Sequence, residues 1–331
     1  MTPSTYLVTG GAGFIGSHLT DSLLAKGHRV VALDNLVTGS EVNLAEAKKS
    51  PNFRFVRGSV LDALLVDELL RECDAVVHLA AAVGVRLILE NPLRSFMTNT
   101  RGTEIVLEAA HRHRRSVLVA STSEIYGKNA SGPLAEDADR TLGSVGTARW
   151  WYSAAKTFDE ILALAYSREL NLPTTAVRFF NTVGPRQSPA YGMVVPRLVR
   201  QAVQNKPLTV HGTGKQSRCF VHIADVVNAL LLVLEHPEAT GRVFNIGTQE
   251  ETTIIQLAER IIARSDSKST ISIVPYEQAY SDGFEDMQRR VPDTERIRAL
   301  TGWSPRFTLD DILDETIAEA RACEVADAAL V

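Results

Sequence analysis

Cysteine is scarce in this chain, and the few cysteines present form no motif. The 331 residues contain three, Cys73, Cys219 and Cys323, which are far apart in the sequence. Their spacing excludes the closely spaced pairs that bind zinc or carry out redox chemistry. An odd number without a disulfide framework is typical of a reduced intracellular protein. We therefore expect no metal site and a cytoplasmic location.

Long hydrophobic runs and a strong charge of either sign are also missing. The longest apolar run, ALLLVL at 229–234, is far too short to cross a bilayer, and no targeting pattern precedes the first apolar segment. The net charge is −4, and the one basic run, HRHRR at 111–115, follows a helical pattern and suits a solvated helix C-terminus. We expect neither a membrane nor a nucleic acid as partner.

The first half of the chain alternates short β-branched runs with amphipathic segments. The strand-like runs are YLVTG, RVVALD, FRFVRG, AVVHLA, SVLVAST and TTAVRFF. The helical segments between them cover residues 14–27, 64–72, 93–113 and 152–170. Strands that alternate with helices form right-handed crossovers. The sequence therefore predicts an α/β fold with a Rossmann-like, doubly wound parallel sheet.

The alternation stops after Asn181, which indicates a smaller second domain. Turn-rich GPRQSPAYG and a helical segment at 192–206 follow, and VFNIG at 243–247 looks like one more strand. We assign residues 1–180 and about 216–250 to the sheet domain. The smaller domain takes 181–215 and 251–325, and 326–331 are expected to fray.

A glycine-rich turn, TGGAGFIG at 9–16, joins the first strand to the first helix. Gly10, Gly13 and Gly16 have the spacing that permits a tight turn, close approach of the backbone to a pyrophosphate, and helix packing on the sheet. Phe14 and Ile15 then open a helix whose free N–H groups attract an anion. This context predicts a dinucleotide site.

An acidic residue selects the nucleotide. Asp34 ends the second strand, 18 positions after Gly16, and Asn35 follows it. A carboxylate there can accept hydrogen bonds from a ribose diol and would repel a 2′-phosphate. The sequence therefore predicts NAD as the cofactor.

Tyr152 and Lys156 in RWWYSAAK are four residues apart and share a helix face, a spacing that ordinary packing also produces. Together with TGGAGFIG and STSEIYG, however, the chain resembles the extended short-chain dehydrogenase/reductase family of NAD-dependent nucleotide-sugar epimerases, dehydratases and decarboxylases. The resemblance runs from Tyr6 to about Thr316, through FFNTVGPRQ, QSRCFVHIADV, FNIG and LTGWSP. The smaller domain would then bind the nucleotide sugar.

The resemblance implies a role for each of these residues. Tyr152 would be the acid-base residue, and Lys156 would lower its pKa and hold the nicotinamide ribose. Thr122 would orient the sugar. Ser59 stands where the family often has an adenine-binding aspartate, so Asp62 is expected to replace it. The resemblance also places Leu79, Ala80 and Ala81 against the cofactor.

The residues around Thr122 indicate the reaction. Ser123 followed by Glu124 resembles the UDP-glucuronate decarboxylases, including the aminoarabinose-pathway enzyme, rather than plain epimerases or dehydratases. By the same match Arg149 and Arg218 lie near the sugar carboxylate, with Arg218 as the candidate proton donor. Three further residues would face the nucleotide and its phosphates, Asn181, Arg186 and Arg290, and Val195 is also expected to bind the substrate.

The leading hypothesis is a UDP-glucuronate decarboxylase that gives UDP-xylose or releases the UDP-4-keto-pentose. The first alternative is a 4-epimerase acting on UDP-glucuronate or UDP-glucose. A second alternative, from another class, is a catalytically silent NAD-binding sensor on the same fold. Family analogy also predicts a homodimer through the helices at 95–112 and 152–170.

Overall fold

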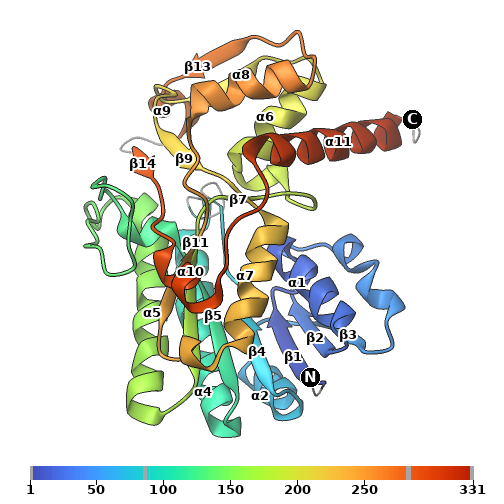
Figure 1. Ribbon diagram of the computed structural model, residues 1–331, viewed down its shortest axis with the longest axis vertical. Helices are drawn as coiled ribbons and strands as arrows, with labels where there is room; N and C mark the ends of the chain where they lie inside the picture. The colour runs from blue at the N-terminus through green and yellow to red at the C-terminus, as the bar shows by residue number, and fades with distance from the viewer. Residues whose placement is uncertain (1–2, 85–87, 89, 281–284, 329–331) are drawn as a thin grey trace.

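A seven-stranded parallel sheet forms the centre of the computed structural model, which describes residues 3–84, 88, 90–280 and 285–328 (Figure 1). The strand order is β11-β6-β5-β4-β1-β2-β3, and every neighbouring pair is parallel. The strands are β1 (Thr5–Thr9), β2 (Arg29–Asp34), β3 (Phe53–Arg57), β4 (Ala75–His78), β5 (Ser116–Thr122), β6 (Thr174–Phe179) and β11 (Val243–Ile246). This confirms the predicted doubly wound parallel sheet, with VFNIG supplying its edge strand.

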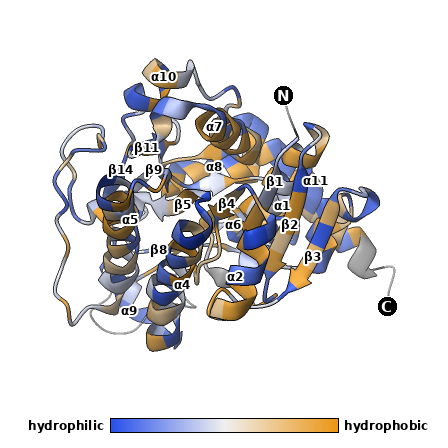
Figure 2. Ribbon diagram, turned by 90° about the horizontal axis from the view of Figure 1, so that it is seen from below, coloured by the Kyte–Doolittle hydropathy of each residue, from blue (hydrophilic) through white to orange (hydrophobic). Residues whose placement is uncertain are grey.

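Helices cover both faces of this sheet, because its strands are buried and apolar on both sides. One apolar cluster joins the sheet to α1 (Phe14–Ala25), α7 (Ile223–Glu235) and α10 (Glu295–Thr301). The other joins it to α2 (Ala63–Glu72), α4 (Pro92–His113) and α5 (Trp151–Leu170). Figure 2 shows the apolar sides of the helices turned toward the strands. The result is a three-layer sandwich with an open edge at the carboxyl ends of the strands.

Helices α4 and α5 pack against each other and begin and end at residues suited to those positions. Pro92 is the first residue of α4, where its missing N–H costs nothing. Arg114 and Asn171 follow the two helices in the left-handed conformation, which lets backbone N–H groups bond back to the last turn. The tightly turned η4 (Ala148–Trp150) leads directly into α5.

A smaller group of elements lies above the carboxyl ends of the strands (Figure 1). It consists of α6 (Val194–Val203), α8 (Ile254–Arg264), α9 (Tyr276–Ala279), α11 (Leu309–Ala328), β7 (Thr182–Val183), β8 (Leu208–His211), β9 (Ser217–Cys219), β10 (Val221–His222), β12 (Glu251–Thr253), β13 (Ile271–Val274) and β14 (Arg289–Arg290). Most of these elements share an apolar cluster centred on α6, α8 and α11. The exact division into two domains stays a prediction. The helix α11 continues into the segment expected to fray, and 329–331 lie outside the described residues.

The composition led to expectations about membrane-spanning helices and metal sites. Within the described ranges, no helix combines the length and the apolar character that crossing a bilayer requires. The same residues contain no group of three or more His, Cys, Asp or Glu side chains arranged to hold a metal ion. Cys73 and Cys219 are buried thiols and Cys323 is exposed.

Candidate active site

One cleft of about 720 Å³ runs along the carboxyl ends of the strands and under the smaller group of elements. It lies where the strand order reverses between β1 and β4, the usual ligand site of an open parallel sheet. The glycine loop lines one end of the cleft, and Tyr152, Arg218 and Arg290 line the other. All the predicted site residues except Asp62 line this cleft.

The glycine loop has the close contacts that its sequence predicts. Gly10 has a φ of +70°, and a Cβ there would lie 2.9 Å from the backbone nitrogen of Ala80. A Cβ on Gly16 would lie 2.1 Å from the carbonyl oxygen of Gly10. Helix α1 begins at Phe14 without a side-chain cap, so its first N–H groups are available to a ligand. This loop fits a dinucleotide pyrophosphate.

Asp34 is held at the end of β2 by backbone donors. Its Oδ2 accepts from the N–H of Ala12 at 3.0 Å, and its Oδ1 accepts from the N–H of Leu36 at 2.8 Å. Burial raises the pKa of Asp34, and these hydrogen bonds oppose that effect. Each oxygen keeps acceptor capacity for a ribose hydroxyl. The fixed carboxylate fits NAD and disfavours a 2′-phosphate.

Asp62 lies outside the lining of the cleft, and the adenine contact expected of it stays a prediction. It is exposed, and its side chain accepts from the N–H of Leu65 at 3.1 Å, which makes it the N-cap of α2. Gly58 and Val60 line the cleft in this segment instead. Leu79, Ala80 and Ala81 follow β4 and line the cleft as expected.

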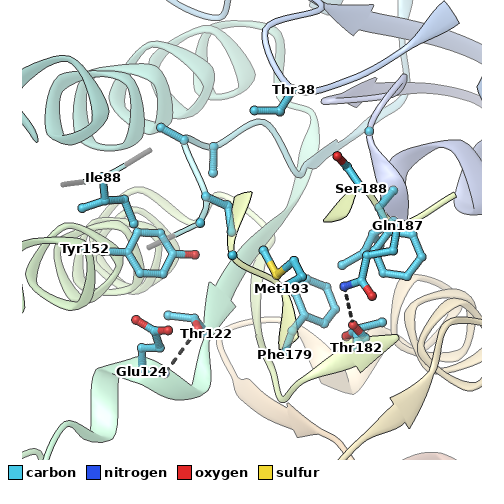
Figure 3. Close-up of a pocket in the computed structure, with 18 of the residues that line it drawn as sticks. Thr38, Ile88, Thr122, Glu124, Tyr152, Phe179, Thr182, Gln187, Ser188 and Met193 are labelled. Atoms are coloured by element: carbon cyan, nitrogen blue, oxygen red, sulfur yellow. Dashed lines mark hydrogen bonds between the residues drawn. The ribbon is translucent and has the colours of Figure 1, made fainter. Parts of the chain in front are cut away.

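Tyr152 and Lys156 lie in the first two turns of α5, and both are buried. Figure 3 shows Tyr152, Thr122 and Glu124 close together at one end of the cleft. Burial raises the pKa of Tyr152, the charges of Glu124 and Asp159 raise it further, and the Thr122 hydroxyl lowers it. The net effect is a pKa of Tyr152 above its ordinary value.

Glu124 is an ionised carboxylate despite its burial. It forms an ion pair with Arg149, and its Oε1 lies 3.5 Å from a guanidinium nitrogen of Arg290. Burial alone would raise the pKa of Glu124, but these cations, Arg149 above all, hold it below the ordinary value. Glu124 cannot therefore donate a proton at neutral pH.

The other two arginines at this end of the cleft, Arg218 and Arg290, have different partners. Arg290 donates to Asn181 at 2.7 Å and to the hydroxyl of Ser123 at 3.3 Å, so it lies beside the Ser-Glu pair rather than only near the nucleotide. Arg218 donates to Asp286 at 2.9 Å. Burial and the nearby Arg218 lower the pKa of Arg290 to about 10. The remaining roles of these arginines stay predictions.

Arg186 and Val195, which are also predicted to bind the substrate, line the cleft as well. Arg186 forms an ion pair of 2.8 Å with Asp21 of α1, and Val195 is a buried residue of α6. Further along, the Gln187 amide donates to the Thr182 carbonyl at 2.9 Å, and Figure 3 shows both beside the cleft.

Sequence reasoning missed three polar residues at this site. Asp286 contacts Arg218, and its Oδ1 lies 3.7 Å from Arg149. Tyr276 donates to Asp286 at 3.2 Å. Asp159 contacts Lys156, and its position seven residues after Tyr152 on one helix face was a usable signal. The other two come from a segment far along the chain, whose proximity only the fold creates.

Comparisons with known proteins identify the family of this chain. The sequence profile of the NAD dependent epimerase/dehydratase family matches residues 6–247. A protein of Bacillus cytotoxicus named UDP-N-acetyl-alpha-D-glucosaminuronate decarboxylase is 39% identical over 96% of this chain and 98% of its own length. UDP-glucuronic acid decarboxylase 1 of Danio rerio is 35% identical over 94% of this chain and 71% of its own length.

A solved structure shows the same likeness in three dimensions. The UDP-glucuronic acid 4-epimerase of Bacillus cereus, in complex with UDP-glucuronic acid and NAD, superimposes with a TM-score of 0.87. It is 29% identical and matches 96% of this chain and 99% of its own chain. The family profile covers most of the chain, and the structure has the glycine loop, the acidic residue and the Tyr-Lys pair in one cleft. The chain belongs to the NAD-dependent epimerase/dehydratase family of nucleotide-sugar enzymes.

Proposed function

We propose that this protein is an NAD-dependent decarboxylase of a UDP-linked hexuronic acid, with UDP-glucuronate as the expected substrate. The observation that carries the proposal is the charge at the Tyr152 end of the cleft. Three buried arginines, Arg149, Arg218 and Arg290, surround the two carboxylates of Glu124 and Asp286. One positive charge is left over beside the Ser-Glu pair.

A sugar carboxylate supplies the negative charge that this cluster lacks. A buried cation without a full partner is costly, so an anion that replaces water beside it is bound strongly. A neutral hexose offers no such charge. The excess lies near Tyr152 and Glu124, where the sugar ring must sit to react, which supports a uronic acid over glucose. The relatives named UDP-glucuronic acid decarboxylases support the same substrate.

The first step proposed is oxidation at C4. Tyr152 removes the O4 proton, and Thr122 hydrogen-bonds the same oxygen and holds the sugar in place. NAD, when bound, would supply the hydride acceptor for C4, and its oxidised nicotinamide would place a positive charge near the phenol. Lys156 contributes a second positive charge, so both cations favour the phenolate. These cations would oppose the effect of burial, which raises the pKa of Tyr152.

The second step proposed is loss of the C6 carboxylate. With a ketone at C4, the electron pair of the C5–C6 bond moves into the carbonyl, carbon dioxide leaves, and an enolate remains. Cationic groups stabilise that negative charge. C5 then takes up a proton. The contacts of Arg290 with Ser123 and Glu124, and its lowered pKa, support Arg290 as the donor in place of Arg218.

Product mass tests the proposal. We expect purified protein with UDP-glucuronate to give a nucleotide sugar lighter by one carbon dioxide, as UDP-xylose or the UDP-4-keto-pentose. Tyr152→Phe is the matched control and should give no turnover. A product of unchanged mass with inverted C4 would establish the epimerase alternative. A folded, NAD-bound protein inert toward UDP- and dTDP-sugars would support the sensor.

A second part of the same experiment tests whether the preferred substrate carries a hydroxyl or an acetamido group at C2 of the sugar. The Bacillus cytotoxicus relative is named for a 2-acetamido sugar acid, whereas the animal and plant relatives are named for glucuronic acid. Offering both UDP-linked acids at equal concentration and comparing the two decarboxylated products gives the preference directly. We expect the glucuronate to be converted faster.

The proposal includes a homodimer formed by α4 and α5. These helices run side by side (Figure 2) and carry large apolar side chains that are exposed. The exposed residues are Leu93, Phe96 and Met97 of α4 and Phe158 and Ile161 of α5. A shared apolar face of this kind supports a two-fold interface between copies of the chain.

A further inference from the structure

Asp159 lies on the same face of α5 as the proposed catalytic pair. Tyr152, Lys156 and Asp159 have the spacing i, i+4 and i+7, which aligns them along one side of a helix. The Nζ of Lys156 is 2.9 Å from Oδ2 of Asp159, and the two side chains are 2% and 0% exposed. Water does not screen such a pair, so its charges act strongly on neighbouring groups.

The second carboxylate oxygen of Asp159, Oδ1, has no hydrogen-bond donor among the described residues. This oxygen is buried. Burial raises the pKa of Asp159, and Lys156 and the nearby Thr103 hydroxyl lower it; that hydroxyl also lies 2.9 Å from the carbonyl oxygen of Asn99. A buried acceptor left without a donor destabilises the fold. A local rule broken in this way is more typical of a functional site than of a structural ion pair.

We infer that Asp159 is a positioning residue that holds the Lys156 ammonium and offsets part of its charge, which sets the pH at which Tyr152 becomes a base. This inference rests on the proposed roles of Tyr152 and Lys156. Without Asp159 the ammonium would favour the phenolate with its full charge. With Asp159 in place, part of that charge is offset, so the phenol ionises at a higher pH than it would beside an unpaired ammonium.

The surrounding charges are consistent with this role. Four titratable side chains face the cluster, from β4, η3 (Ser123–Tyr126), η4 and α5: His78, Glu124, Arg149 and Glu160. Burial lowers the pKa of His78 to about 3, so it is neutral, and α4 adds only the uncharged Thr103. Glu160 forms a buried ion pair of 2.8 Å with Arg178. Glu124 is paired with Arg149, yet its charge raises the pKa of Tyr152 more than the charge of Asp159 does. Asp159 is the remaining negative charge beside Lys156 in this described set.

Charge removal at constant shape tests the inference. We expect Asp159→Asn to move the rising limb of the pH profile to lower pH by about one unit, the size expected for one charge several ångström away. The profile is the rate of NADH absorbance growth in a single turnover of UDP-glucuronate. Asp159→Glu keeps the charge and should keep the limb near its original position. Glu169→Gln removes an exposed charge from the same helix and should leave it unchanged.

A measurement without sugar separates this inference from the proposed function. Near-UV tyrosinate absorbance of the NAD-loaded protein, with Tyr152→Phe subtracted, titrates the Tyr152 phenol directly. The same shift to lower pH is expected there for Asp159→Asn, whether or not UDP-glucuronate is the substrate. A limb or titration that does not move, or moves to higher pH, overturns the inference. Asp159→Ser also removes the charge and replaces the Asn variant if that variant does not fold.

Discussion

Arg218 and Arg290 stand directly opposite each other in the parallel pair of β9 and β14. Their guanidinium groups nevertheless have different partners, Asp286 for Arg218 and Asn181 for Arg290. Burial and the neighbouring cation together lower the pKa of Arg290. The short β9–β14 pairing thus brings two like charges to the same end of the cleft, where the carboxylates of Asp286 and Glu124 balance them in part.

Arg290→Met should separate oxidation from decarboxylation. Loss of a charge-stabilising donor typically slows a step by about 10²- to 10³-fold, and only the steps after oxidation use Arg290 in the proposed mechanism. In rapid mixing with UDP-glucuronate, NADH absorbance should therefore rise and persist while carbon dioxide release falls. Arg218→Met is the matched variant and should mainly raise KM. Equal loss of oxidation and decarboxylation in Arg290→Met would contradict the assignment.

Asp34→Ala should weaken NAD binding. The variant loses a charged acceptor facing the cleft and two bonds to backbone N–H groups, so a cost of about 1.5–3 kcal/mol is expected, roughly a tenfold to hundredfold rise in Kd. Discrimination against NADP should fall at the same time, because the repelling charge is gone. Calorimetric titration with both nucleotides measures this. Asp62→Ala, outside the cleft, should bind NAD as the unmodified chain does.

Glu124 should contribute pH-dependent stability through its pair with Arg149. Its pKa in the folded state lies below the unfolded value. The contribution is therefore complete above about pH 5 and is lost as pH falls through the folded pKa. Removing one partner of a buried pair costs about 3 kcal/mol. The difference in free energy of unfolding between the original chain and Glu124→Gln, from urea titrations, should shrink in acid.

A surface pair provides the control for that experiment. Glu295 and Arg298 form an exposed ion pair on α10, with 59% and 64% of their side chains exposed. Solvent screens such pairs. Glu295→Gln should therefore change the free energy of unfolding little at any pH. A Glu124→Gln difference that stays constant down to strongly acid pH would show that Glu124 is not the group responsible.

Phe158→Glu should dissociate the proposed dimer. A charge in the centre of an apolar interface between α5 helices loses its hydration on association. Light scattering after size-exclusion chromatography should show a monomer with unchanged helical content. Val42→Glu changes an apolar residue that is 80% exposed on η1 (Glu41–Leu44), and it should leave the mass unaltered. A monomer in the unmodified chain would rule out this interface under the conditions used.

Short sequence patterns alone predict much of the candidate active site. The glycine spacing at 10–16, the carboxylate of Asp34 and the Tyr152-Lys156 pair each depend on a short stretch of chain, so the sequence predicts them. Asp62 shows the limit of that reasoning. A carboxylate just before a helix is an equally good N-cap, and capping α2 is the role that the structure shows.

The sequence by itself determined the alternation of strands and helices, the nucleotide loop and the family to which the chain belongs. These depend on periodicity and short motifs, which local sterics and hydrogen bonding decide. Only the tertiary structure decided which arginine lies beside Ser123 and Glu124. It also brought Asp286 to Arg218 and revealed the burial of Asp159 next to Lys156. Such contacts join residues 68 to 167 positions apart or depend on desolvation, and neither can be read from spacing along the chain.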